Sequence, residues 1–207
     1  MSRRFKAATL FKAARQEIRH QLRWAVPMRM VGVLTDWMPD NRVTIRLRGR
    51  LASLFIKDCG KNFQMGSQVT LLNPHELRVG DDVYVARGGW LNAMGGLELQ
   101  DEVVLGPYVV ISTLQHVFKD GSVRFGGSTA APVSIGRGSW LAAHVSVKCG
   151  TRVGRGNLVA ANACVVKDTP DNVVVGGVPA RVLGENRDGE AEFQSRHEFD
   201  RSRGADE

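Results

Sequence analysis

Cysteine is scarce in this 207-residue sequence: there are three, Cys59, Cys149 and Cys164, and no two of them form a CxxC pair. Three thiols cannot all be bridged within one chain, so a disulfide framework is excluded, and the missing CxxC spacing argues against a thiolate-rich zinc site. We interpret them as small, buried or half-buried residues of a protein from a reducing compartment.

Long hydrophobic runs are also missing. No stretch approaches 18 consecutive apolar residues, and the N-terminus shows no apolar segment followed by a small-residue cleavage site. These absences argue against a membrane-spanning helix and a signal peptide, and they predict a cytoplasmic protein. With 43% hydrophobic residues, the chain is long enough for one main domain with a substantial core.

Acidic residues are few at one end of the chain. Residues 1–50 contain twelve Lys or Arg against three acids, although the net charge of the whole chain is only +7. A charge confined to one end is a local surface feature, so we do not expect nucleic acid as a partner.

Residues 3–24 have apolar side chains at helical spacing beside a stripe of arginines, which predicts a basic amphipathic helix. The apolar positions are Phe11, Ala14, Ile18 and Leu22. Two interpretations stay open: packing against the main domain or a neighbouring subunit, or peripheral contact of residues 1–24 with the inner face of an anionic membrane. We expect Pro27 and Pro39 to break the chain after this helix.

Aliphatic residues recur at intervals of six along much of the sequence. The aliphatic residues at this interval are Val79, Val85, Leu91, Leu99, Leu105, Ile111, Ile135, Leu141, Val147, Val153, Val159 and Val165. The next position is often Gly or Ala, and the fourth position after the aliphatic residue is small or β-branched, a pattern typical of short strands joined by tight turns. Since three strands and three turns close one coil, the sequence predicts a parallel β-helix of hexapeptide repeats.

Two segments interrupt or end this array. Between Ile111 and Ile135, "STLQHVFKDGSVRFGGSTAAPV" has charges and a Gly pair where aliphatic residues are expected, so we predict a protruding loop. Pro170 and Pro179 are expected to close the stack of coils. The predicted organisation is therefore a basic helical segment over 1–50, a β-helix domain over 51–184 and a flexible, acid-rich tail over 185–207.

The array that ends in "VVKDTPDNVVVGGVPARVLG" resembles the left-handed β-helix acyltransferases, in the branch of sugar and polysaccharide O-acetyltransferases that includes maltose and galactoside acetyltransferases. The resemblance covers about residues 60–184. It implies an all-β, left-handed parallel β-helix with an extra N-terminal α-helix. It also implies a homotrimer that holds acetyl-CoA, the acyl donor, between neighbouring β-helices. The left hand comes from the resemblance alone, because crossover connections are usually right-handed.

In that family the catalytic histidine lies in a segment like I-x-T-x-x-H, and "ISTLQH" implies His116 for this role. Val117 follows it where the family often has Asp or Pro, so the group that orients the imidazole stays open. A sugar hydroxyl is a poor nucleophile at neutral pH, so its acetylation needs a general base. Histidine suits this role because its ordinary pKa is about 6.5. The resemblance implies Asn92 in acceptor binding, and Trp90 and Gln115 are further acceptor candidates.

For the coenzyme end, the resemblance implies small residues along the pantetheine arm, two cations near phosphate and a proline on adenine. These candidates are Ala142, Ala160, Ala161, Lys167, Arg181 and Pro179, with Trp140 beside them. Trp90 and Trp140 could each stack on a sugar ring or pack against a neighbouring subunit.

The predicted function is acetyl-CoA-dependent O-acetylation of a sugar hydroxyl, on a cell-surface polysaccharide or its lipid-linked precursor, by direct transfer in a ternary complex. Antibiotic or amino-sugar N-acetylation is the alternative within enzymes, and a β-helix scaffold is the alternative outside them. A γ-type carbonic anhydrase would need His75, His116 and His144 to converge on a metal, and their spacing lacks the close pair typical of such a site. We therefore expect no metal.

Overall fold

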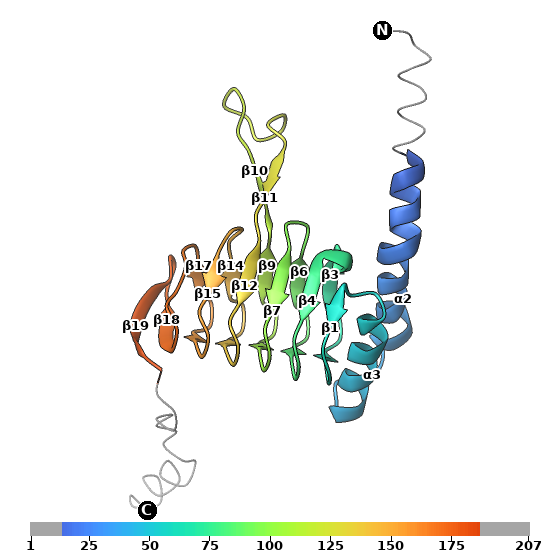
Figure 1. The fold of residues 1–207 in the computed structure, drawn as a ribbon, viewed down its shortest axis with the longest axis horizontal. Helices are drawn as coiled ribbons and strands as arrows, with labels where there is room; N and C mark the ends of the chain where they lie inside the picture. The colour runs from blue at the N-terminus through green and yellow to red at the C-terminus, as the bar shows by residue number, and fades with distance from the viewer. Residues whose placement is uncertain (1–13, 187–207) are drawn as a thin grey trace, which may run out of the picture.

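The body of the molecule is a three-sided stack of β-coils, shown in Figure 1; the computed structural model describes residues 14–186. Sheet 1 contains β1 (Asp58–Cys59), β4 (Leu77–Val79), β7 (Leu97–Leu99), β12 (Val133–Ile135) and β15 (Arg152–Val153). Sheet 2 contains β2 (Gln64–Met65), β5 (Tyr84–Val85), β8 (Val104–Leu105), β13 (Trp140–Leu141), β16 (Leu158–Val159) and β18 (Val173–Gly176). Sheet 3 contains β3 (Thr70–Leu72), β6 (Trp90–Asn92), β9 (Val110–Ser112), β14 (Ser146–Val147) and β17 (Cys164–Val165). The predicted left-handed parallel β-helix is confirmed.

The period-six residues form the core of this stack. All twelve aliphatic residues of the predicted series are buried, with relative exposures of 4% or less. Full burial of such a side chain stabilises the fold by roughly 1.5–3 kcal/mol. In most coils the residue four positions later is buried as well, as at Val103 and Val145. At Asn157 this residue carries an amide whose Nδ2 donates to Thr169 Oγ1 at 2.7 Å and whose Oδ1 accepts from the Val173 backbone nitrogen at 3.0 Å. The core therefore tolerates this polar residue, because partners are present for both ends of its amide.

The corners between sheets depend on two separate positions. The third residue after most inward aliphatics is left-handed, with φ of 57° at Asp82 and 62° at Gly156. The Gly or Ala directly after the aliphatic has a different role, because a Cβ at Gly80 would lie 2.6 Å from the backbone nitrogen of Asp101 on the next coil. The small-residue column that we read as a turn signal is therefore required by close stacking, and the left-handed turn comes two residues later.

The N-terminal segment is longer and more helical than predicted. Residues 14–20 are α-helical, and the helix continues through the π-helical turn η1 (Gln21–Ala25) into α2 (Val26–Thr35). The expected break at Pro27 is wrong: this proline lies in the first turn of α2, and the wider π-helical turn before it accommodates a residue that lacks a backbone N–H. The break at Pro39 is confirmed, since a non-helical connection there leads to α3 (Arg42–Ser53).

The helices cover the first-coil end of the β-helix (Figure 1). Helix α3 begins at Asn41, whose Oδ1 accepts from the backbone nitrogens of Val43 and Thr44. It lies so close to β2 that a Cβ at Gly49 would collide with the carbonyl of Phe63. The short 3₁₀ turn η2 (Pro74–Glu76) follows β3 on the same first coil.

The predicted protruding loop is a β-hairpin. Strand β10 (Leu114–His116) pairs antiparallel with β11 (Ser128–Ala130), and the hairpin leaves the body on the side toward which the N-terminal helix also extends (Figure 1). At the other end of the stack, β19 (Arg181–Glu185) pairs antiparallel with β18 and closes sheet 2. Phe11 of the predicted apolar stripe and residues 187–207 of the predicted tail lie outside the described residues. Within residues 14–186, no helix has both the length and the apolarity needed to span a bilayer.

Candidate active site

The hairpin is anchored to the coil of Asn92 through Thr113, a fully buried residue at its base. Thr113 Oγ1 donates to the Asn92 carbonyl at 2.8 Å and accepts from the Gly95 amide at 2.8 Å. The carbonyl of Thr113 accepts from the amide of Ala131, on the returning strand, at 3.0 Å. These bonds fix both legs of the hairpin where it leaves sheet 3, so His116 lies only three residues beyond a rigid anchor.

His116 is exposed on β10, opposite Ser128 on β11, and its neighbour Gln115 is exposed opposite Thr129. Within residues 14–186, no hydrogen bond is made to the His116 ring. No residue of the described chain therefore orients the imidazole. This agrees with the sequence, in which Val117 stands where the family often has Asp or Pro.

Asn92 and Trp90 lie on strand β6, one coil before the hairpin. Leu91 between them faces the core, so both point to the outer face of sheet 3. The Oδ1 atom of Asn92 accepts from Asn73 Nδ2 at 3.0 Å and from the Met94 amide at 3.2 Å. The Nδ2 group makes no hydrogen bond within the described residues, so it is available to donate to an acceptor hydroxyl.

The alanine candidates stack on successive coils at the corner where sheet 2 leads into sheet 3. The amide of Ala142 donates to Val159 and the amide of Ala160 donates to Val175, at 2.9 and 2.8 Å. Arg181 is paired with Gly176, which continues the same column. We call this corner the alanine edge, and it also carries the remaining coenzyme candidates Trp140, Ala161 and Pro179. Its small side chains leave backbone accessible to a narrow, extended ligand.

Lys167 does not join that group. It is exposed after β17, at the corner where sheet 3 leads into sheet 1, which is also the corner that Asn92 and the hairpin occupy. We call this corner the hairpin edge. The structure therefore divides the predicted site residues between the two edges of sheet 3, with Asn92, Gln115, His116 and Lys167 on one edge and the alanine column on the other.

An aromatic pair on the alanine edge, Tyr108 and His144, was not among the predicted site residues. The rings of Tyr108 and His144 stack at 5.2 Å with an interplanar angle of 12°. Both residues have positive φ, at 58° and 60°. A bulky side chain at a corner position otherwise rich in Asn, Asp and Gly was the signal that could have identified them.

The part of the chain that the structure describes contains no cluster of three or more His, Cys, Asp or Glu side chains able to hold a metal. His75 stacks on Trp24 at 5.5 Å, far along the stack from His144. All three cysteines are free and half-buried. Burial, with the charges of Asp58 and Asp81, raises the pKa of Cys59 to about 11, so this thiol is a poor nucleophile.

No family model matches the chain. It is 33% identical over 171 residues to WcaF of Escherichia coli (strain K12), named for an acetyltransferase of colanic acid biosynthesis, covering 81% of this chain and 87% of that protein. It is 28% identical to the galactoside O-acetyltransferase of the same strain over 62% of this chain and 54% of that protein.

Solved structures share the fold. A galactoside acetyltransferase in complex with coenzyme A aligns with a TM-score of 0.72 and 22% identity, over 82% of this chain and 84% of that one. A hexapeptide-repeat acetyltransferase from Vibrio cholerae, complexed with acetyl-CoA, aligns with a TM-score of 0.69 and 21% identity, over 79% and 87%.

Proposed function

The chain belongs to the hexapeptide-repeat acetyltransferases, and we propose that it acetylates a hydroxyl group of a sugar, with acetyl-CoA as the acyl donor. The names of its relatives, for colanic acid biosynthesis and for galactosides, support an acceptor in a cell-surface polysaccharide or its precursor. The observation that carries the proposal is that His116 lies on a hairpin whose base, at Thr113, is hydrogen-bonded to the Asn92 carbonyl.

The alanine edge fits the coenzyme. Ala142 and Ala160 have small, half-buried side chains and Ala161 is exposed, so a pantetheine arm can lie against the backbone there. The exposed cations Arg181 and Lys167 suit phosphate groups. Acetyl-CoA supplies the acetyl group as an activated thioester.

His116 acts as the general base in this proposal. A ring nitrogen accepts the proton of the acceptor hydroxyl while that oxygen bonds to the acyl carbon, and His116 then returns the proton to the sulfur that leaves. Asn92 Nδ2 donates to the acceptor and holds it in place. The nearby thiol of Cys149 donates to the Thr113 carbonyl at 3.3 Å, which supports direct transfer without an acyl-cysteine intermediate.

The division of the site residues supports a homotrimer. His116 and the alanine column occupy opposite edges of sheet 3 in one chain, so a site that uses both forms where the hairpin edge of one subunit meets the alanine edge of the next. Such a head-to-tail contact forms a ring when the rotation between subunits closes on the first subunit, as in a trimer. A neighbouring subunit or the bound substrates would then supply the group that orients His116.

The test pairs turnover with coenzyme binding. His116→Ala is expected to slow acetyl transfer by roughly 10²- to 10⁴-fold while CoA binds as in the wild type. Arg46→Ala, at an exposed position on α3, is the control, because Arg46 lies outside the proposed site. Mass spectrometry of products from glycans, amino sugars and lipid-linked sugars separates O- from N-acetylation. Normal turnover in His116→Ala would exclude it as the base.

Contact with an anionic membrane surface is part of the same proposal. Ile18 and Leu22 are 59% and 64% exposed on the N-terminal helix, and Arg15, Arg19 and Arg23 are exposed beside them. This arrangement gains both apolar burial and electrostatic attraction at such a surface. Reversing the three arginines to glutamate is expected to abolish binding to phosphatidylglycerol vesicles at low salt; retention of binding would contradict the contact.

A further inference from the structure

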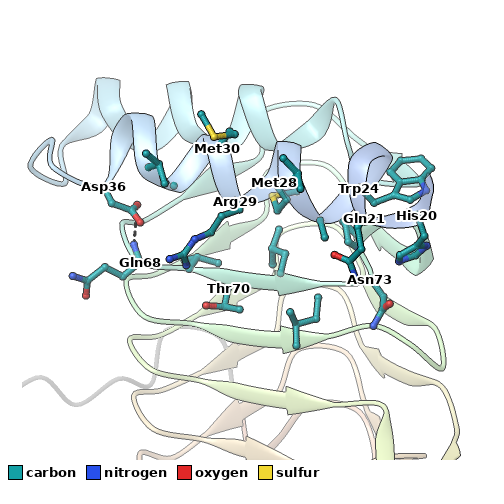
Figure 2. A pocket seen from close by; sticks show the side chains of 18 residues that line it. His20, Gln21, Trp24, Met28, Arg29, Met30, Asp36, Gln68, Thr70 and Asn73 are labelled. Atoms are coloured by element: carbon teal, nitrogen blue, oxygen red, sulfur yellow. Dashed lines mark hydrogen bonds between the residues drawn. The ribbon is translucent and has the colours of Figure 1, made fainter. Parts of the chain in front are cut away.

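The helices at the first-coil end expose an apolar surface on the side that faces away from the β-helix. Met28 and Val31 of α2 belong to the core, and exposed apolar side chains recur on the opposite side of the same helix. In Figure 2, Met30 lies on that outer side, whereas Arg29 extends toward the strands. We call this surface the helical cap. Its apolar residues are 40–78% exposed, and they are Ile18, Leu22, Val26, Met30, Val33, Leu34, Trp37, Val43, Leu47 and Leu54.

The π-helical turn η1 keeps this surface continuous along the N-terminal helix. Apolar side chains four residues apart drift around an α-helix, because one turn takes only about 3.6 residues. A π-helical turn closes its hydrogen bonds over five residues instead of four, and the extra residue offsets this drift between Ile18 and Val26. One apolar stripe therefore runs from Ile18 to Trp37 along a single side of the helix.

Helix α3 adds a second stripe that also faces away from the first coil. Its buried residues include Gly49 and Ala52, and the backbone at Gly49 lies against the end of the first coil, next to β2. Val43, Leu47 and Leu54 are exposed on the opposite side. Helices α2 and α3 pack on each other and cover the same end of the stack (Figure 1). The two stripes therefore form one surface.

A row of three exposed arginines, spaced four residues apart, borders each stripe. Like charges at this spacing destabilise a helix, and none of the six arginines forms an ion pair within the described chain. Of the three acids in residues 14–54, two are hydrogen-bonded to the first coil, so Glu17 alone offsets the six charges. The helical cap is therefore strongly basic as well as apolar. Its arginines are Arg15, Arg19, Arg23, Arg42, Arg46 and Arg50.

An anionic bilayer matches both features of the helical cap, because it offers negative charge beside an apolar interior. A nucleic acid would match the charge but leave the apolar stripes in water. A second copy of the cap would bring the arginine rows face to face. Trp37 is the most exposed apolar residue of the cap, and its Nε1 donates to the Leu34 carbonyl at 2.8 Å. An outward indole whose only donor is satisfied suits the membrane interface.

We infer that the helical cap docks on an anionic bilayer, with Trp37 and the apolar stripes of both helices in the interface and the β-helix standing above it. This inference rests on the membrane contact of the proposed function and extends it from the N-terminal helix to the whole first-coil end. Strand β6, with Asn92, follows β3 in sheet 3, and the hairpin leaves after β9, so both lie within about 10 Å of the first coil. The helices add about 10 Å, so an acceptor carried by the bilayer would meet the candidate site close to the membrane surface.

The proposed trimer would present three helical caps at once. The hairpin edge and the alanine edge both run along the stack, so a contact between them places the three-fold axis parallel to the stack. All three caps then lie at one end of the assembly. One planar surface can touch them together, and linked contacts bind more tightly than a single one.

The experiment measures co-sedimentation of the full chain with phosphatidylglycerol vesicles at low salt, and phosphatidylcholine vesicles are the uncharged probe. Trp37→Glu and Val43→Glu should each weaken binding by at least about tenfold, because each places a carboxylate in the interface. Phe125→Glu is the matched control, since Phe125 is 79% exposed on the hairpin and outside the cap. It should change binding by less than about twofold.

The charge is tested separately. Reversing Arg42 and Arg50 together to glutamate should weaken binding to phosphatidylglycerol by at least about tenfold. Reversing Arg78 and Arg124, which are exposed outside the cap, makes the same change in net charge and is the control. Brominated phosphatidylglycerol should quench tryptophan fluorescence in the wild type, and the quenching should fall in Trp37→Phe.

Several results would overturn the inference. Unchanged binding in Trp37→Glu and Val43→Glu, with loss on reversal of Arg15, Arg19 and Arg23, would confine the contact to the N-terminal helix. Equal binding to the two kinds of vesicle would exclude a role for the charge. A dimer of the assembly that Trp37→Glu dissociates, detected by light scattering, would assign the cap to a second copy.

A wild type that binds neither vesicle would refute both this inference and the membrane contact of the proposed function. Acetyl transfer to a water-soluble sugar is measured in parallel and should persist in Trp37→Glu and Val43→Glu. Its absence from the wild type would refute the proposed acetylation and leave the vesicle result unaffected.

Discussion

Nη1 of Arg48 donates to Oδ1 of Asp40 at 2.6 Å, and the same carboxylate accepts from the amide and the hydroxyl of Ser67, each at 3.0 Å. Nη2 of Arg48 donates to the carbonyls of Thr35 and Met38. The Arg48 side chain is completely buried. One of the twelve basic residues of the N-terminal segment is therefore not a surface charge, because it joins the connection between α2 and α3 to the first coil.

Replacing Arg48 by methionine should lower the free energy of unfolding by about 3 kcal/mol, because Asp40 and two carbonyls lose their donor. Urea denaturation of the variant measures the loss. Arg46→Met, an exposed position on the same helix, is the control and should stay within about 0.5 kcal/mol of the wild type. Equal losses in the two variants would show that the buried network does not contribute.

Asn157→Asp should destabilise the last coils although the two side chains have nearly the same shape. The Nδ2 group donates to Thr169 Oγ1 and to the Pro170 carbonyl, at 2.7 and 2.9 Å, and a carboxylate oxygen cannot donate to either. The residue is 1% exposed, so we expect a loss of about 2–4 kcal/mol at neutral pH. Thermal unfolding checks this, and an unchanged midpoint would contradict it.

Gly80→Ala and Gly121→Ala separate the two reasons for glycine in this fold. A Cβ at Gly80 would meet backbone of the next coil at 2.6 Å, whereas Gly121 has a φ of 75° with open space around it. We expect Gly80→Ala to cost more than about 2 kcal/mol, since a rigid coil must shift, and Gly121→Ala to cost about 1–2 kcal/mol in its hairpin. The reverse order, measured by chemical denaturation, would mean that turn conformation and not coil stacking requires the small-residue column.

His75 should make stability fall at mildly acidic pH. Burial, helped by the charge of His20, lowers the pKa of His75 despite the opposing effect of Glu76. Its Nδ1 atom is buried without a hydrogen-bond partner among the described residues. Between the ordinary value near 6.5 and this lowered pKa, the unfolded chain binds the proton more strongly, so stability decreases as the pH falls.

The check for His75 compares urea midpoints at about pH 7.5 and about pH 5.5. The difference should shrink in His75→Gln and persist in the exposed control His144→Asn. If the difference is the same in His75→Gln as in the wild type, other groups cause the pH dependence.

Much of the β-helix could be predicted because its order is local. Each inward residue, such as Ile135 or Leu141, has the next one six positions later, so the pattern of burial can be read along the chain without knowing which coils touch. The protruding loop was predictable for the same reason, since its charges interrupt that pattern, whereas the pairing of its two legs into a hairpin was not predicted. The motif around His116 could be found from six neighbouring letters, and the structure places it at the hairpin edge.

Contacts between segments far apart in the sequence could not be predicted from the local pattern. Whether Arg48 is a surface charge depends on Asp40 and Ser67, which approach it only when the helices pack on the first coil. The continuous helix through Pro27 depends on a π-helical turn for which sequence periodicity gives no sign. The cavity between the N-terminal helix and β3 (Figure 2) exists because the helix lies beside the edge strand of sheet 3.

The sequence by itself determined the coil and its core, because a six-residue period specifies side-chain direction through local backbone geometry. The catalytic candidate His116 came from the resemblance of "ISTLQH" to the motif of the acyltransferase family. Only the tertiary structure decided that the candidate residues occupy two edges of sheet 3, and that Asn73, which lines the cavity beside the N-terminal helix, donates to Asn92. Those relationships join segments from different coils and from the helices, and the distances between them are set by how the elements stack and not by any local pattern.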